Sequence, residues 1–386
     1  MNRLFRVFFI LAGLLLWGSD LAVAQPQFSS EATVAYAQTI AFRLEGELAA
    51  PVERVDLFLQ PTEAERPSSV RIIRVSQTDN HLVAEVDVEP ADAELPPFAT
   101  VRFWWEVQTA DETIVVPEES FYYADDRFAW RELITDDVTI RWTGNDDKLG
   151  QVAAEIVAQS RATLDDILPQ TAVSPLNVYI YPSTGDLRSG LRLAGRDWEN
   201  GHTDPALGVL LVTAVNPLTA ATELSQSIPH ELTHLRLHRL AAGSELPFWY
   251  EEGLALLAEG SQVGAGLLAT AVANDTTLPL LNLCVAFPQD GDEAELALAQ
   301  SASLLRHIRA QFGDQALRQL ATAYLNGASC ENGLTQTLDM SLAQLNVDWL
   351  AAESPQPGWQ TFLTENGLWL LLVVVSFGFM ALLLRR

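Results

Sequence analysis

The hydrophobic pattern changes its period along the chain, so one architecture cannot account for all 386 residues. Between residues 28 and 124, apolar and polar residues alternate in short runs that are separated by proline, aspartate and asparagine. The runs cover residues 40–44, 55–59, 70–75, 82–88 and 101–107. A period of two is typical of half-buried strands. We therefore expect residues 28–124 to form an immunoglobulin-like β-sandwich that serves as a spacer or docking module.

The pattern beyond the sandwich predicts an α+β domain over residues 130–350. Strands and one long helix are expected first, at 138–142, 149–168, 176–181 and 208–213. From residue 261 onward the chain is rich in alanine, leucine and glutamine at helical spacing, so we expect this domain to end in a helical part.

Both ends of the chain are apolar. Residues 1–24 have the charged start, the apolar run and the small-residue cleavage site of a secretory signal peptide. Residues 368–384 contain no charge and precede two arginines, which predicts a transmembrane helix after a juxtamembrane linker at 351–367. The alternative for this end is an apolar helix packed on the body. We expect a single-pass protein of the cell membrane with the bulk of the chain extracytoplasmic.

The overall charge excludes one broad class of function. The formal net charge is −27, and such a surface repels phosphate backbones, so we expect no nucleic-acid partner. Hydrophobic residues make up 48% of the chain, which is enough for a buried core and excludes a disordered protein.

Residues 230–234 read His-Glu-Leu-Thr-His, a metal-binding pattern. On a helix, residues four apart are offset by about 40° and rise about 6 Å, so the imidazoles of His230 and His234 can reach one ion. Glu231 lies about 100° round the helix from His230, which leaves it free to act as a general base on a water molecule. His238 would lie about 12 Å along the axis from His230, too far to share that ion.

A third ligand is expected from the next helix. Gly243 provides a helix stop and Pro247 a suitable first-turn residue, so the chain turns back before a second helix. Glu252 shares the apolar face of that helix, and Gly253 would let the two helices approach closely. Glu251 lies about 100° away and is the alternative ligand, because spacing alone hardly separates the two glutamates.

These residues resemble the gluzincin metallopeptidases, and most closely the peptidase MA-like proteins. The resemblance rests on the His-Glu-x-x-His pattern followed by a glutamate directly before glycine, and it extends from about residue 130 to 350. It implies a zincin-like fold in which His230, His234 and Glu252 bind one Zn²⁺ and Glu231 activates the water. The resemblance thus favours the second of the two glutamates as the ligand.

The resemblance also implies that a strand before the metal helix binds extended substrate by main-chain pairing. The residues expected there are Gly208, Val209, Leu210, Leu211 and Val212. Members of the family often carry tyrosine just before a Gln-Ser pair, whereas this chain has Leu298 and Ala299 there. A transition-state hydrogen-bond donor is therefore not transferred, and Tyr250, His307 and Tyr324 remain as candidates.

Together these features predict a membrane-anchored, extracytoplasmic zinc metallopeptidase that acts on peptide or protein substrates. The alternative is a non-catalytic surface binding or structural protein with a degenerate metallopeptidase fold. An exported chain meets oxidising conditions, which favours a disulfide between Cys284 and Cys330 over two buried free thiols.

Overall fold

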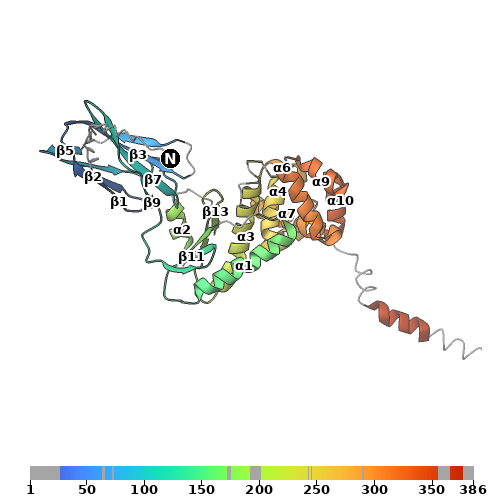
Figure 1. Cartoon of the computed structure of the whole chain (residues 1–386). Helices are drawn as coiled ribbons and strands as arrows, with labels where there is room; N and C mark the ends of the chain where they lie inside the picture. Colours follow the sequence, from blue (N-terminus) through green and yellow to red (C-terminus); the bar gives the residue numbers. More distant parts are fainter. Residues whose placement is uncertain are drawn as a thin grey trace, which may run out of the picture. The chain divides into compact units, whose positions relative to one another are not determined.

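The described chain divides into two compact units (Figure 1). The computed structural model describes residues 27–62, 66–71, 74–171, 175–191, 201–241, 243–244, 246–288, 291–354 and 366–376. Among the described residues, the first unit comprises those up to Pro96 together with Thr100–Tyr123, and the second comprises Pro97–Ala99 and those from Ala124 onward. The predicted signal peptide, residues 1–24, lies outside the described residues.

Two antiparallel sheets build the first unit. One has the strand order β1 (Phe28–Val34), β2 (Ile40–Glu47), β6 (His81–Val88) and β5 (Arg74–Thr78). The other has the order β4 (Ser68–Arg71), β3 (Val52–Pro61), β7 (Thr100–Thr109) and β8 (Thr113–Val115), and β9 (Glu119–Tyr122) also pairs with β7. The rings of Phe42 and Phe103, one from each sheet, lie 5.2 Å apart, so the alternating apolar side chains of both sheets meet in one core.

The expectation of a single strand at 70–75 is wrong. The two ends of this run belong to different sheets, because β4 pairs with β3 whereas β5 pairs with β6. Alternation does not reveal such a change of sheet, since apolar residues recur with the same period on both sides of the crossing.

A five-stranded sheet supports the second unit. Its order is β10 (Arg131–Ile134), β11 (Val138–Trp142), β12 (Leu176–Tyr181), β14 (Val209–Thr213) and β13 (Gly201–Asp204). The three central strands are parallel and the two outer strands are antiparallel to their neighbours. Both faces are covered: Val178 and Ile180 lie in the helical core, whereas Tyr179 and Tyr181 lie in a second apolar cluster.

Helices carry the rest of the second unit. They are α1 (Leu149–Ile167), α2 (Thr184–Leu191), α3 (Ala220–Ala241), α4 (Phe248–Glu259), α5 (Ala265–Ala273), α6 (Leu280–Val285), α7 (Gly291–Phe312), α8 (Asp314–Leu325), α9 (Cys330–Leu338) and α10 (Leu342–Glu353). Helix α3 buries Leu224, Ile228 and Leu232, which recur every four residues and face the core. It ends before Gly243, whose φ of +93° favours glycine, and α4 follows Pro247.

Helix α4 packs closely against α7, and both appear in the group of helices that follows α3 in Figure 1. A Cβ added at Gly253 would lie 2.7 Å from the main-chain oxygen of Ser301, so this glycine permits the approach of α7 rather than of α3. Gln300 pairs through its side chain with the main-chain N–H and C=O of Leu278, at 3.0 and 2.7 Å. A disulfide between Cys284 and Cys330 joins α6 to α9.

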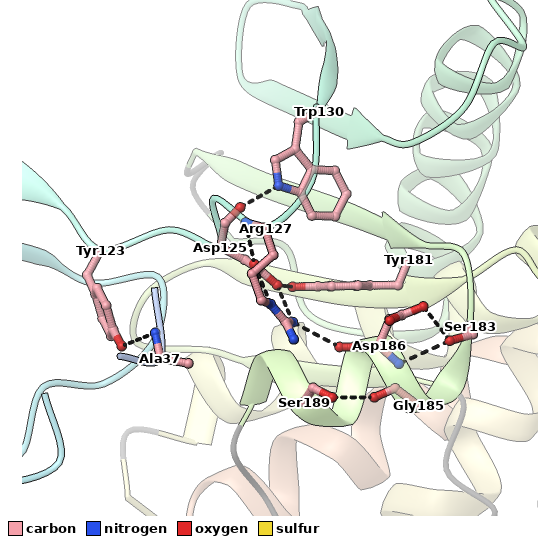
Figure 2. Close-up of polar contacts among 10 residues, drawn as sticks. All are labelled: Ala37, Tyr123, Asp125, Arg127, Trp130, Tyr181, Ser183, Gly185, Asp186 and Ser189. Atoms are coloured by element: carbon pink, nitrogen blue, oxygen red, sulfur yellow. Dashed lines mark hydrogen bonds and ion pairs between the residues drawn. The ribbon is translucent and has the colours of Figure 1, made fainter. Parts of the chain in front are cut away.

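The segment that leads into the second unit is held by a buried carboxylate (Figure 2). Asp125 accepts hydrogen bonds from the Arg127 guanidinium at 2.6 and 2.8 Å and from the Tyr181 hydroxyl at 2.9 Å. Its main-chain oxygen accepts from the Trp130 indole at 2.5 Å. Because Asp125 is fully buried, these bonds supply the partners that a carboxylate needs away from water.

The predicted transmembrane helix at 368–384 is wrong. Within the described part of the chain, no helix is both long enough and apolar enough to cross a membrane. Of the predicted span, residues 368–376 are described as helix, and residues 377–384 lie outside the described residues. The predicted linker at 351–367 lies partly outside the described residues, and α10 reaches into it as far as Glu353.

Candidate metal centre

Helices α3 and α4 bring three ligand atoms to one point. His230 Nε2 and His234 Nε2 are 3.2 Å apart, and Glu252 Oε2 lies 4.0 and 3.9 Å from them. A triangle with these sides has its centre about 2.2 Å from each corner, close to the length of zinc bonds to imidazole and carboxylate. The three residues therefore fit a single divalent ion.

Two further glutamates of α4 orient the imidazoles. Glu259 contacts His230 Nδ1 at 3.1 Å, and Glu251 contacts His234 Nδ1 at 2.9 Å. An ionised carboxylate can only accept, so each Nδ1 carries a proton. The other ring nitrogen, Nε2, therefore faces the ligand site in both residues, which is the arrangement that supporting carboxylates give to metal-binding histidines.

His238 also contacts Glu251, whose Oε1 lies 2.8 Å from His238 Nε2. His234, His238 and Glu251 thus form a second group of ligand types in close proximity. Their contacts of 2.8 and 2.9 Å are hydrogen-bond distances, so Glu251 accepts from two imidazoles at once. This geometry distinguishes the two glutamates that spacing in the sequence hardly separates. Oε2 of Glu252 faces the Nε2 atoms of both histidines, whereas Glu251 contacts His234 at Nδ1, on the side of the ring away from the ligand site.

The acidic surroundings change two proton affinities. Burial lowers the pKa of His234, but the hydrogen bond to Glu251 and the charges of Glu252 and Glu231 outweigh it and raise the pKa to about 9. Burial raises the pKa of Glu251, but its hydrogen bonds with His234 and His238 lower the pKa to about 2. Without metal, His234 is therefore a cation at neutral pH, and an ion that binds there takes the place of its Nε2 proton.

Glu231 lies against the edge strand β13. The Thr203 hydroxyl is 2.9 Å from Glu231 Oε2 and 3.0 Å from the Glu231 main-chain oxygen. Gly201, two residues earlier on β13, adjoins the same side chain. Glu231 is not part of the ligand triangle and remains available for proton transfer.

The ligand set opens into a cleft of about 400 Å³. His230, Glu231 and Glu252 line it together, and apolar side chains such as Leu256 and Leu298 complete its walls. Among the described lining residues there are four glutamates and neither lysine nor arginine. The cleft therefore has a negative potential that favours a cation.

The prediction that residues 208–212 form a free, substrate-binding edge is wrong. Strand β14 pairs with β12 on one side and β13 on the other, so β13 is the outer strand. Sequence reasoning missed β13 because its four residues, Gly-His-Thr-Asp, include no apolar side chain to give a period.

Two of the three suggested transition-state hydrogen-bond donors, Tyr250 and Tyr324, donate to main-chain oxygens instead. The Tyr250 hydroxyl donates to the Leu317 main-chain oxygen and the Tyr324 hydroxyl to that of Cys330, both at 3.0 Å. Both rings are buried in the helical core. His307 is not among the lining residues of the cleft that the structure describes.

The orienting residues Glu251 and Glu259 were also missed as a pair. Glu259 follows Glu252 by seven residues, which places these two glutamates on one face of the helix. The helical period could therefore have indicated that Glu259 lies near the ligand site. The contact of Thr203 with Glu231 has no comparable signal, because 28 residues separate the two in the sequence.

Three solved structures are weakly similar to this chain. The crystal structure of a Br derivative of BhCBM56 is 6% identical at a TM-score of 0.18, and the match covers 25% of this chain and 90% of that one. Two crystal structures of a GH family 64 laminaripentaose-producing β-1,3-glucanase from Paenibacillus barengoltzii, one complexed with laminarihexaose, are 9% and 10% identical, again at 0.18. Each match covers 31% of this chain, which spans only 27% and 28% of the glucanase chains. At that score these likenesses bear on neither fold nor function.

The comparison with curated proteins finds no match. A family model, in contrast, covers a little over half of the chain: the model described as the Peptidase MA superfamily matches residues 157–353. The matched part begins in α1, includes both helices of the candidate metal centre and ends with α10. The chain belongs to the Peptidase MA superfamily.

Proposed function

We propose that this chain is a zinc-dependent metallopeptidase that hydrolyses peptide bonds. The observation that carries the proposal is the ligand triangle of His230, His234 and Glu252, whose centre is about one zinc bond length from each corner and which shares its cleft with Glu231. Membership of the Peptidase MA superfamily supports a peptidase activity.

Each residue has a distinct part in this reaction. His230, His234 and Glu252 would hold one Zn²⁺, which polarises the scissile carbonyl and lowers the pKa of a water molecule. Glu231 accepts a proton from the attacking water and passes it to the leaving amine. Glu251 and Glu259 keep the two imidazoles in the tautomer that presents Nε2.

The outer edge of β13 supports an extended peptide as substrate. Within the described residues this strand is the outermost of the sheet, and its Gly201 lines the cleft. A peptide that adds to this edge as a further strand is held by main-chain hydrogen bonds, which makes binding tolerant of side-chain sequence. Its scissile bond would then pass beside Glu231.

Replacing Glu231 by glutamine tests the proposed reaction. The unaltered protein and the Glu231→Gln variant should both bind zinc in a 1:1 ratio, because none of the three ligands changes. It should lose hydrolysis of a peptide library, because glutamine cannot accept the proton. Turnover equal to that of the unaltered protein would refute the role of Glu231.

Leu298 favours a second candidate function, non-catalytic binding of peptides by the same fold. It lines the cleft near the position where members of the resembled family often carry a tyrosine, and its side chain offers no hydrogen bond to a transition state. Zinc bound at full occupancy without cleavage of any peptide in the library would select this alternative.

We also propose that the protein works in an oxidising, extracytoplasmic compartment. The disulfide between Cys284 and Cys330 supports this location, since such bonds persist mainly outside reducing compartments. Free thiols in denatured, unreduced protein isolated from its cells would contradict it.

A further inference from the structure

We propose that Thr203 and Gly201 of strand β13 are positioning residues that set the Glu231 carboxylate for proton transfer. The inference rests on the proposed function for its catalytic consequence, but the contact itself can be tested without activity. Neither residue would touch the metal, and both act through Glu231.

The first observation is the hydroxyl of Thr203. It lies within hydrogen-bond distance of both the carboxylate and the main-chain oxygen of Glu231, at 2.9 and 3.0 Å. A hydroxyl has one hydrogen to donate, and a bond to a charged carboxylate is the stronger of the two. Because threonine is branched at Cβ, its χ1 angle is restricted and the hydroxyl is held toward α3. Thr203 therefore fixes one oxygen of Glu231 and leaves the other for the water.

The second observation is the space at Gly201. A Cβ added there would lie 2.7 Å from Cδ of Glu231 and closer still to its Oε1. Gly201 is not one of the glycines with positive φ, so an alanine could adopt its backbone conformation. What the glycine provides is room for the carboxylate. Residues 201 and 203 point to the same face of the strand, so one face of β13 confines Glu231 from two sides.

The arrangement links the base to the substrate. Strand β13 has its inner pairing with β14 and an outer edge without a neighbouring strand in the described sheet. A peptide bound to that edge and the carboxylate held by that strand then share one support, which keeps their separation constant. Misplacement of a reacting group by a small distance can reduce a rate greatly.

The test uses the full chain loaded with zinc and four single variants. Thr203→Val removes the hydroxyl at nearly constant volume, and Thr203→Ser restores it. Gly201→Ala inserts a methyl group beside the carboxylate. Glu231→Gln shows the kcat that remains when the base is lost. We expect Thr203→Val to lower kcat roughly 10- to 100-fold, the value of one charge-assisted hydrogen bond, with KM and zinc content little changed. Gly201→Ala should also lower kcat with zinc content little changed, because its methyl group displaces the carboxylate. Thr203→Ser should recover most of the rate.

A merely structural role predicts a different result. In that case Thr203→Val would unfold at a lower temperature while its folded, zinc-loaded fraction kept the full kcat, and this outcome would overturn the inference. Failure of Thr203→Ser to recover activity would also overturn it, because the hydroxyl would not be the relevant group. If Thr203→Val does not fold, Gly201→Ala decides: an unchanged kcat rejects the inference.

A double-mutant cycle provides the readout that needs no activity. The unfolding equilibrium constant is measured for the unaltered chain, Thr203→Val, Glu231→Met and the double variant. We expect Thr203→Val to raise this constant roughly tenfold beside Glu231. Beside methionine the rise should be clearly smaller, because there the hydroxyl can donate only to the main-chain oxygen of residue 231. Absence of coupling overturns the inference even if the protein is an active peptidase. Coupling in a protein that cleaves no peptide would establish the contact and reject the proposed function instead.

Discussion

Replacing Glu251 by glutamine should weaken zinc binding without abolishing it, whereas the same change at Glu252 should remove most of the affinity. The two residues are adjacent on α4, but their carboxylates have different neighbours. Glu252 Oε2 lies 3.9 and 4.0 Å from the two Nε2 atoms across the space for the ion. Glu251 Oε1 lies behind His234, 2.9 Å from Nδ1.

The magnitude for Glu251 has two opposing parts. Loss of a carboxylate that orients a metal-binding histidine lowers affinity roughly 10- to 100-fold, which is about 1.4 to 2.7 kcal/mol. The same carboxylate helps to raise the pKa of His234 to about 9, so at pH 7 zinc must displace a proton at a cost of about 2.7 kcal/mol. Glu251→Gln removes part of that cost. The affinity ratio between the unaltered protein and this variant should therefore be larger at pH 9 than at pH 7.

The assay is competition for zinc with a chromophoric chelator at both pH values. Glu293→Gln, which changes an exposed glutamate of α7, is the matched control and should leave the affinity unchanged. The assignment is refuted if Glu251→Gln loses zinc to the extent expected for Glu252→Gln while Glu252→Gln shows only the smaller loss. A ratio that does not depend on pH would refute the explanation through the His234 proton.

Two further predictions concern the packing and the proton balance of the same centre. Gly253→Ala should destabilise the second unit by about 1–3 kcal/mol and weaken zinc binding, because the added Cβ would press on the main chain of Ser301. Thermal unfolding measures the stability and zinc titration the affinity. A variant that is as stable and binds zinc as tightly as the unaltered protein contradicts the packing argument. In the zinc-free protein, the pKa of His234 lies above its unfolded value of 6.5, so its stabilisation is complete below pH 6.5 and is lost as the pH rises through about 9. Unfolding of chelator-treated protein should therefore show a loss of about 3 kcal/mol across this window, and an unchanged stability would be inconsistent with a protonated His234.

Elements with a strong local signal could be predicted from the sequence. The strand at 176–181 has the bounds of β12, and the helix expected at 149–168 ends one residue beyond α1. The helix is long and the strand is apolar except at Asn177, so local pattern and tertiary burial agree. The sheet change at 70–75 and the edge strand β13 could not be predicted, because both depend on which distant strand provides the partner.

In the metal centre too, features set by local sequence could be predicted and features set by tertiary arrangement could not. Gly243 and Pro247 locate the turn between α3 and α4 by their backbone preferences, which act locally. The choice between Glu251 and Glu252 is not local, because it depends on the rotation of α4 relative to α3. Only the positions of the two imidazoles show which carboxylate faces the ion, and the family resemblance had to supply that preference for the sequence.

The dependence of the centre on α4 explains why the helices beyond it belong to the functional unit. One face of α4 supplies the third ligand, and the helix also carries both carboxylates that orient the histidines. A shift of α4 would therefore disturb all three ligands together. Its position is fixed from the other side, where Gly253 meets the main chain of α7 and Tyr250 donates to the main chain of α8. Gln300 in turn ties α7 to the segment before α6. The C-terminal helices, which contribute no ligand, thus determine whether the ligand triangle keeps the size of a zinc site.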